Sequence, residues 1–322
     1  MMSSNIGPRP SDNGLSAAEE LHLVIDERYL KKLCVPPGRT VRVKDYDTGW
    51  PESRELKKRG EEAARTRAEQ ALAASREQLK KAQDLLYAGD RHSVLIVLQA
   101  MDAAGKDGTI RHVMSGVNPQ GCQVFSFKQP STEELDHDFL WRCTKSLPER
   151  GRIGIFNRSY YEEVVVVKVH EEWLDRQRLP TRRYDGKFWR QRYEDINAFE
   201  RHLVRNGTVI LKFFLNVSKE EQKKRFLERL DNPKKHWKFS AADLAERQLW
   251  NQYMNAYGEA FSATSTRWAP WYIIPGDYKW SARAMIADIV ARTIRSLDLR
   301  YPELSRETRR ALKSARRQLE RE

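Results

Sequence analysis

Five short apolar segments recur along the chain, separated by longer stretches that are rich in charged residues. Each is β-branched or aromatic in character and bounded by Gly, Asn or Pro, which is typical of buried strands. The segments are SVLIVL (residues 93–98), CQVFSF (122–127), RIGIF (152–156), VILKFFL (209–215) and WYIIP (271–275). The pattern therefore predicts five strands.

The stretches between these segments have helical features. Ser131–Glu134, Ser218–Glu221 and Ser240–Asp243 each match the capping box that opens a helix. Residues 53–88 are rich in Glu, Lys, Arg and Ala, with apolar side chains near helical spacing, which predicts one long amphipathic helix. Strands alternating with helices predict an α/β fold, in which a mainly parallel sheet is covered on both faces.

Residues 157–207 form an unusually long gap between the third and fourth strands, dense in Arg, Trp and Tyr. Such an insertion suggests a lid over a site, at about residues 160–206. Within it, EEVVVVKVH (residues 162–170) contains four consecutive valines. This run fits either a buried strand or a buried helix, because periodicity does not separate the two.

The two ends of the chain differ from the part between them. Residues 1–45 begin with a polar stretch that lacks the layout of a secretory signal, and we expect them to form an N-terminal extension. Residues 46–300 hold the predicted domain, and residues 301–322 are expected to be a charged helical tail. Because no apolar stretch approaches the roughly 20 residues of a spanning helix, we expect a cytoplasmic protein without a membrane partner.

The charge balance narrows the class of partner. Lys and Arg total 58 against 45 Asp and Glu, a formal net charge of +13, which favours a polyanionic partner such as nucleic acid, an acidic membrane or polyphosphate. Charge alone does not choose among these. Three cysteines form no CxxC pair and are expected to be buried thiols, and seven histidines without ligand spacing predict no zinc site.

The first candidate site follows the first predicted strand, in the sequence AMDAAGKDGTI (residues 100–110). A phosphate-binding loop needs a strand, small residues that let backbone N–H groups converge, and a helix N-terminus that faces the anion. The strict pattern GxxxxGK[ST] fails at Ala100 and at Asp107, so Asp102 is the natural candidate to hold a metal. The alternative is a plain strand-to-helix turn with Lys106 on the surface.

The second candidate site is GIFNRSYYEE (residues 154–163), at the end of the third predicted strand. Ligands of open α/β sheets bind at the carboxyl ends of strands, so Asn157, Arg158 and Glu162 can face the same crevice as Lys106. Arg158 offers bidentate hydrogen bonds to phosphate oxygens. Taken alone, the motif also fits an ordinary strand end with a surface arginine.

At this point the sequence resembles the type-2 polyphosphate kinases over residues 46–299. The motifs that carry the resemblance are MDAAGKDGTIRHVMSGVNPQGCQVFSFKQPS (101–131), HDFLWR (137–142), FNRSYYEEVVVVKVH (156–170), DNPKKHWKFS (231–240) and SATSTRWAPWYIIPGDYKW (262–280). The resemblance implies a P-loop kinase-like three-layer αβα sandwich with a parallel five-stranded sheet and a helical lid. It also implies inorganic polyphosphate as phosphoryl donor. NRSYYEEV looks like the class III branch, which phosphorylates nucleoside mono- and diphosphates; the ADP-specific branch has Asn in place of Glu162.

The resemblance further implies roles for single residues. Asp102 is the implied metal ligand, Lys106 the phosphate clamp and Arg158 the group that stabilises the transition state. Glu162 lies near the acceptor phosphate or a second metal, and Asn157 completes the predicted catalytic set. The implied cofactor is Mg²⁺, with Mn²⁺ as the alternative. Many family members have Gly where this chain has Ala100, whose methyl group narrows the loop.

A long polyanion also needs a track of positive charge. The predicted phosphate- and polyphosphate-binding residues are Ala103, Ala104, Gly105, Lys106, Asp107, Gly108, Thr109, Arg111, Lys128, Arg225, Arg229, Lys234, Lys235 and Lys238. For each basic side chain the alternative is a solvated surface charge. Trp237 is a candidate to pin the loop that carries the lysines. The aromatic residues Tyr184, Phe188, Trp189 and Tyr193 fit core packing better than stacking on a nucleotide base.

Two other functions remain open from the sequence. One is an ATP-dependent nucleotide or small-molecule kinase on the same fold, and the other is a non-catalytic polyanion or nucleic-acid binder. The expected partners are polyphosphate and nucleoside mono- or diphosphates rather than nucleic acid. The resemblance also implies a homodimer or homotetramer, for which the helix at 53–88 could supply an interface.

Overall fold

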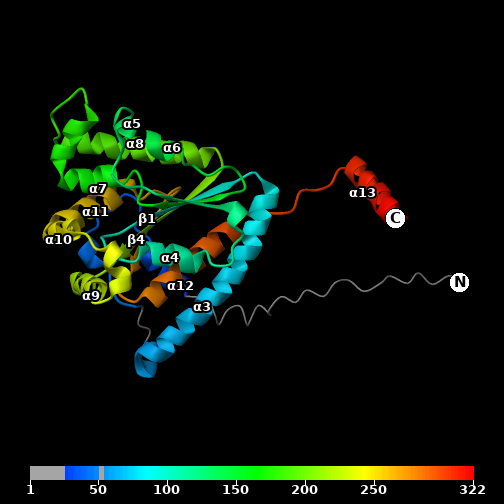
Figure 1. The fold of residues 1–322 in the computed structure, drawn as a ribbon, viewed down its shortest axis with the longest axis horizontal. Coiled ribbons are helices and arrows are strands. Elements are labelled where there is room, and N and C mark those ends of the chain that lie inside the picture. Colours follow the sequence, from blue (N-terminus) through cyan, green and yellow to red (C-terminus); the bar gives the residue numbers. More distant parts are fainter. Residues whose placement is uncertain (1–25, 51–53) are drawn as a thin grey trace.

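A five-stranded sheet forms the centre of the computed structural model, which describes residues 26–50 and 54–322 (Figure 1). The strands are β1 (Ser93–Gln99), β2 (Cys122–Ser126), β3 (Ile153–Asn157), β4 (Thr208–Asn216) and β5 (Trp271–Pro275). They pair in the order β2-β3-β1-β4-β5, and every pair is parallel. The predicted strands and the predicted α/β class are confirmed.

Both faces of the sheet are buried, as a parallel sheet requires. Along β1, Val94, Ile96 and Leu98 belong to one hydrophobic cluster, whereas Leu95 and Val97 belong to the other. Each cluster lies between the sheet and one layer of helices. The molecule is therefore a three-layer αβα sandwich.

The first face is covered by α3 (Arg54–Gly89), α4 (Lys106–Val113) and α12 (Lys279–Arg295). In Figure 1 the long α3 runs beside α12 and α4. The predicted long amphipathic helix is confirmed, with an interruption at Gly60, whose φ of 82° lies outside the helical range. Leu79 and Leu86 of α3 are fully buried against the other two helices and the sheet.

The second face is covered by α7 (Glu162–Val169), α8 (Gly186–Arg205) and α11 (Trp250–Thr264). The valine run is therefore a helix, with Val164, Val165 and Val167 buried between the sheet and α11. Helix α8 packs its apolar side against β4. Of the segment predicted to be a lid, α8 thus belongs to the second layer of helices.

The shorter elements connect these layers. They are α2 (Glu27–Leu33), η1 (Val43–Asp45), η2 (Pro119–Gly121), α5 (Thr132–Leu135), α6 (Trp141–Thr144), η3 (Glu171–Gln177), α9 (Lys219–Leu230), η4 (Pro233–Lys238) and α10 (Ala241–Gln248). Ser131, Ser218 and Ser240 each cap the helix predicted to follow, and Ser131 forms the complete capping box with Glu134. No helix in the described part of the chain is long and apolar enough to span a membrane.

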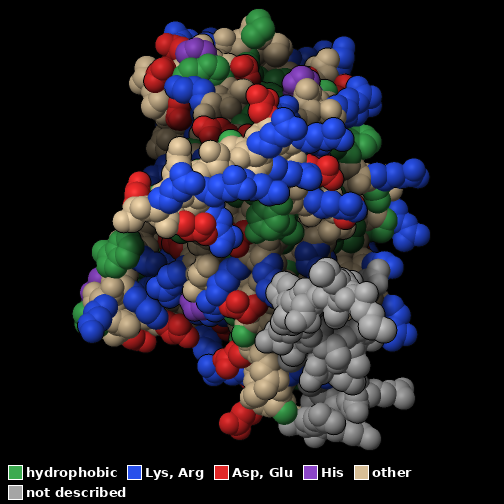
Figure 2. Space-filling view, turned by 90° about the vertical axis from the view of Figure 1, so that its right-hand side faces the viewer, with side chains coloured by type: hydrophobic (Ala, Val, Ile, Leu, Met, Phe, Trp, Pro, Cys, Tyr) green, Lys and Arg blue, Asp and Glu red, His purple; other side chains and the backbone are tan. Residues whose placement is uncertain are grey.

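The two ends of the described chain differ in how they pack against the domain. Val35 donates its N–H to the carbonyl of Trp271 in β5 at 2.9 Å, and Val35 and Val43 are buried. Part of the predicted N-terminal extension, from residue 35 at the latest, therefore packs on the domain. Residues 1–25 lie outside the described residues. Helix α13 (Arg306–Leu319) projects from the body with every residue exposed, and Lys and Arg side chains gather on that side of the molecule (Figures 1 and 2).

Candidate active site

Two loops meet at the carboxyl edge of the sheet, because β1 and β3 are adjacent. Leu98 pairs with Asn157 at the ends of these strands, so the loop at residues 100–105 lies beside the turn at residues 158–161. The first loop leads into α4 on one face, and the turn leads into α7 on the other. This divergence of connections creates the crevice in which open α/β sheets bind ligands.

The loop after β1 has the backbone of a phosphate cradle. Gly105 has a φ of 102°, and α4 begins at Lys106, so the helix N-terminus faces the loop. Ala103 also has a left-handed φ, of 61°, which is unfavourable for a residue with a Cβ atom. An alanine stays in this conformation only where its surroundings hold it there.

Arg225 of α9 holds the loop in place. Its side chain is 3% exposed, and its guanidinium donates to the carbonyl oxygens of Ala103 (3.3 Å) and Ala104 (2.7 Å). Its remaining N–H groups donate to the carbonyls of Gly276 and Asp277 and to the Glu221 carboxylate. All five donors of the side chain are thus occupied within the protein. Arg225, predicted as part of the polyphosphate track, instead clamps the phosphate loop.

Lys106 lies inside the loop. Its Nζ donates to the carbonyl of Ala100 at 2.9 Å, and its side chain is buried. Burial lowers the pKa of the ammonium, and the nearby Arg158 lowers it further. The Ala100 contact shows that alanine in place of the usual glycine leaves the lysine seated in the loop.

Arg158, Asp102 and Glu162 face one another across the crevice. The Arg158 guanidinium lies 2.7 Å from the Asp102 carboxylate and 3.6 Å from that of Glu162. The carboxylate of Glu162 foremost, and that of Asp102 after it, raise the pKa of Arg158. Burial raises the pKa of Glu162, although Arg158 and Lys106 oppose this. The structure therefore brings together the four groups that the two motifs predict.

Asp102 and Glu162 form a donor set that suits Mg²⁺. Magnesium is commonly bound by one or two carboxylates together with substrate phosphates and water. Both carboxylates lie beside the Arg158 guanidinium, and the charge of Asp102 contributes to the raised pKa of Glu162. In the described part of the chain, no group of three or more His, Cys, Asp or Glu side chains could hold a metal alone.

Asn157 and Asp107 connect the two loops at the rim. Asn157 Nδ2 donates to Asp107 Oδ1 at 2.8 Å, and Lys238 of η4 lies 3.9 Å from the same carboxylate. The Asp107 side chain is 72% exposed. Asp107 therefore joins β3, α4 and η4, in the position where a P-loop normally has a hydroxyl residue.

A cavity of about 250 Å³ opens from this crevice between α7, η3, α10 and α11. At one end lie Asp102, Arg158 and Glu162. The rest of its wall combines apolar side chains, among them Leu135, Val166, Val167 and Trp173, with charged ones, among them Lys128, Arg142, Glu163 and Arg176. A cavity with both apolar and charged parts of its wall suits a molecule that has a ring and a phosphate.

Two carboxylates of α10 also line the cavity, and the sequence offered no signal for either. Asp243 lies 3.3 Å from Arg229, and its pKa is raised by burial and then by the charge of Asp102. Glu246 lies 2.9 Å from the His170 ring and accepts a hydrogen bond from Tyr253. Helix α10 is separated from the first motif by more than 130 residues, and only the fold brings them together.

The predicted track residues fall into separate groups. Lys128 lines the cavity, and Lys234, Lys235 and Lys238 are exposed on η4. Trp237 is 78% exposed and does not pin this segment, contrary to the expectation. Arg229 is half-buried and paired with Asp243.

Two basic residues of α12 were missed by the sequence reasoning. Arg283 lies against Gly108 of α4, and its Nε is buried without a hydrogen-bond partner among the described residues. Burial lowers the pKa of Arg283, and the charges of Arg111 and Arg225 lower it further. Burial also lowers the pKa of Lys279, and the charges of Arg225 and Lys235 lower it further. Positive charge therefore continues from the phosphate loop along α4 and α12.

The aromatic residues of the segment 184–193 lie in the protein core. Trp189 and Tyr193 are buried in the second hydrophobic cluster, and Tyr184 and Phe188 pack against it. None of them lines the cavity described above. The expectation of core packing is confirmed.

The fold is a parallel αβα sandwich with a phosphate cradle after its central strand. At the mouth of this cradle lie a buried lysine, an arginine and two carboxylates. This combination of fold and site defines a P-loop-type phosphotransferase. The family model of polyphosphate kinase 2 matches residues 62–301, and the chain belongs to this family.

Relatives of known sequence and structure agree with this assignment. The chain is 57% identical over 244 residues to an ADP-polyphosphate phosphotransferase of Rhodopseudomonas palustris, covering 76% of this chain and 84% of the relative. It is 44% identical to an AMP/ADP-polyphosphate phosphotransferase of Meiothermus ruber, covering 85% and 96%. The crystal structure of polyphosphate kinase 2 from Arthrobacter aurescens is similar with a TM-score of 0.71 and 41% identity, covering 78% of this chain and 87% of that one.

The clamp on the phosphate loop generates a first prediction. We expect Arg225→Lys to lower the free energy of unfolding by about 1–3 kcal/mol, because an ammonium cannot reach all the carbonyls that the guanidinium bonds and some stay buried without a donor. Urea unfolding measures this change. Arg229→Lys, four residues further along α9, is the matched control and should change stability by less than about 1 kcal/mol. Equal stability of both variants would contradict the clamp.

Proposed function

We propose that this protein transfers a phosphoryl group from inorganic polyphosphate to AMP and to ADP, forming ADP and ATP. The observation that carries the proposal is that Arg158, Asp102 and Glu162 line one cavity, beside a phosphate loop whose buried Lys106 interacts electrostatically with all three. Membership of the polyphosphate kinase 2 family supports polyphosphate as donor. The names of the relatives support adenine nucleotides as acceptors.

The geometry suggests where each substrate binds. The donor phosphate fits the cradle at residues 103–109, where backbone N–H groups and the N-terminus of α4 favour an anion. The acceptor fits the cavity, with its phosphate toward Arg158 and its base against Val166, Val167 and Trp173. The reacting phosphates then meet between Lys106 and Arg158.

In this reaction the protein positions the two substrates and neutralises their charge, and it does not need to transfer a proton. An oxygen of the acceptor phosphate forms a bond to a phosphorus of the donor while the anhydride P–O bond breaks, and the shortened chain leaves as an oxyanion. The acceptor oxygen is already ionised, so no general base is needed. Lys106 and Arg158 neutralise charge on the transferred oxygens.

Magnesium is the proposed cofactor, with Mn²⁺ as the alternative, and Asp102 and Glu162 are the residues that would hold it. When bound, a divalent cation lowers the repulsion between the two phosphate chains. Asp102 accepts from Arg158 before the substrates arrive, so the carboxylate is already oriented toward the crevice.

The most detailed part of the proposal is the choice of acceptor nucleotide. Glu162 is the feature that favours activity on both nucleoside mono- and diphosphates. The relative at 57% identity is named for ADP alone, whereas the relative at 44% is named for both AMP and ADP. We favour both acceptors, a cytoplasmic location and a homodimer or homotetramer.

The first test of the proposed function is direct. Purified protein is mixed with Mg²⁺, long-chain polyphosphate and AMP without ATP, and nucleotides are followed by chromatography. We expect ADP and then ATP to appear. If only ADP accumulates, the acceptor range is restricted to AMP. If AMP gives no product, the assay is repeated with ADP as the acceptor. If ADP is not phosphorylated either, an ATP-dependent kinase replaces the proposal.

Two substitutions test the catalytic groups. We expect Asp102→Asn and Lys106→Ala each to lower kcat by on the order of 10²-fold or more, because each removes charge or a metal ligand aimed at the reacting phosphates. Circular dichroism should show an unchanged fold. Polyphosphate binding by Asp102→Asn should persist, since the substitution removes a negative charge. Normal rates in both variants would reject the site.

The basic side chains of α4 and α12 are expected to contribute to binding of the polyphosphate donor. We expect the double variant Arg111→Gln/Arg283→Gln to raise the KM for long-chain polyphosphate and to reduce its dependence on salt, because fewer counterions are released on binding. The KM for AMP should stay unchanged. Arg65→Gln/Arg67→Gln on α3 removes the same charge elsewhere and serves as the control. Equal effects of the two double variants would show that only net charge matters.

A further inference from the structure

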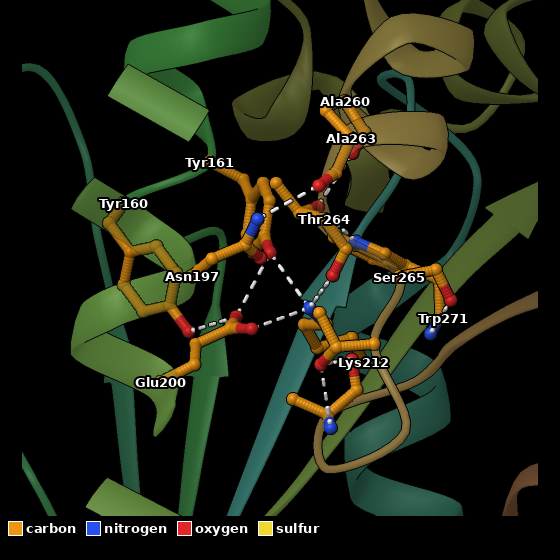
Figure 3. Close-up of polar contacts among 12 residues, drawn as sticks. Tyr160, Tyr161, Asn197, Glu200, Lys212, Ala260, Ala263, Thr264, Ser265 and Trp271 are labelled. Atoms are coloured by element: carbon orange, nitrogen blue, oxygen red, sulfur yellow. Dashed lines mark hydrogen bonds and ion pairs between the residues drawn. The ribbon is translucent and has the colours of Figure 1, made fainter. Parts of the chain in front are cut away.

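A fully buried ion pair lies directly behind the turn that carries Arg158 and Glu162. Lys212 of β4 and Glu200 of α8 are both 0% exposed, and Lys212 Nζ lies 2.7 Å from Glu200 Oε2 (Figure 3). The other Glu200 oxygen accepts from the hydroxyls of Tyr160 and Tyr161, each at 2.9 Å. Lys212 also donates to the Tyr161 hydroxyl (2.9 Å) and to the carbonyl of Thr264 (2.8 Å).

This network reaches the site through a short stretch of chain. Arg158 and Glu162 are separated only by Ser159, Tyr160 and Tyr161, all of which are 0% exposed. Ser159 accepts from Gln99 of β1 at 3.1 Å, so this stretch is held from both sides. Any shift of the two tyrosine rings would therefore move Arg158 and Glu162.

The backbone of Arg158 needs such support. Its φ is 65°, in the left-handed region that is unfavourable for a residue with a side chain. On one side its N–H donates to the carbonyl of Leu98 at 3.0 Å. On its C-terminal side, Arg158 is followed directly by the buried residues 159–161. Strained backbone of this kind persists only where neighbouring contacts determine it.

We propose that Glu200 and Lys212 are positioning residues for phosphoryl transfer, acting through Tyr160 and Tyr161 to set the positions of Arg158 and Glu162. This inference rests on the proposed function of Arg158 and Glu162. Neither residue of the pair touches the cavity, so the effect is transmitted through the turn.

The chemistry of the pair explains why a charged network suits this task. Burying two charges is costly, and replacing a buried pair by apolar groups is often neutral or stabilising. An ammonium nevertheless has three directed donors, and here they meet three acceptors from the turn, α8 and the end of α11. Such directed bonds define one position for Tyr161, whereas apolar packing permits small shifts.

Two variants separate positioning from stability. The double variant Tyr160→Phe/Tyr161→Phe removes only the two hydroxyls. A second variant adds Glu200→Met and Lys212→Met, which makes the network apolar without leaving a lone buried charge. For both we expect kcat to fall by about 10- to 100-fold, with the KM values for AMP and polyphosphate within about threefold, because a small misplacement of a catalytic group lowers the rate steeply.

Controls connect the effect to Arg158. Leu79→Ala, in the core on the opposite face, lowers stability without touching the turn, and its kcat should stay at the wild-type value below its Tm. In an Arg158→Ala background, the network variants should lower kcat by a smaller factor than in the wild-type background, because only the position of Glu162 is then still affected. Unchanged kcat in folded network variants, or a further full loss in the Arg158→Ala background, would overturn the inference. Wild-type protein inactive with polyphosphate would instead reject the proposed function.

Discussion

The parallel pairing of β1 with β3 is the constraint on which the candidate site depends. It places the ends of the two strands side by side, so that the loop after one strand and the turn after the other must share a crevice. Neither motif is sufficient alone. Asp102 lacks its arginine partner without the turn, and Arg158 lacks a phosphate cradle without the loop. Because the following helices lie on opposite faces of the sheet, a crevice opens between the loop and the turn.

The loop after β1 and the turn after β3 are stabilised in the same way. Each contains a non-glycine residue with a left-handed backbone, Ala103 in the loop and Arg158 in the turn. Each is fixed by a buried cation from another part of the fold, because Arg225 bonds the loop carbonyls and Lys212 bonds a tyrosine that follows Arg158. A cation with several directed donors bonds several acceptors at once, whereas a hydrophobic contact has no direction. The unfavourable backbone conformations and the buried charges are therefore two parts of one arrangement.

The sequence predicts the strands and the four central site residues because both depend on local signals. Apolar runs bounded by turn residues mark the strands, and the carboxyl edge of a parallel sheet is where their polar neighbours gather. The clamping contacts of Arg225 have no local signal, because this residue lies in a run of charged residues typical of a surface helix and its partner Ala104 is 121 residues away. Asp243 and Arg283 gave no local signal. Lys212 did give one, since a lysine inside the apolar run VILKFFL must find a buried partner, but the partner itself could not be identified from the sequence.

The distribution of charge explains why a protein with a net charge of +13 keeps carboxylates at its centre. Near the reacting groups, Lys106 and Arg158 face Asp102, Glu162 and Asp243, so the excess of positive charge lies elsewhere, on η4, α12 and α13. Peripheral cations attract and retain a polyanion at long range. At the centre, however, a purely cationic site would hold donor and product equally firmly and would gain little for the transition state. Carboxylates at the centre suit the divalent cation of the proposed function, which would add positive charge there only together with the substrates.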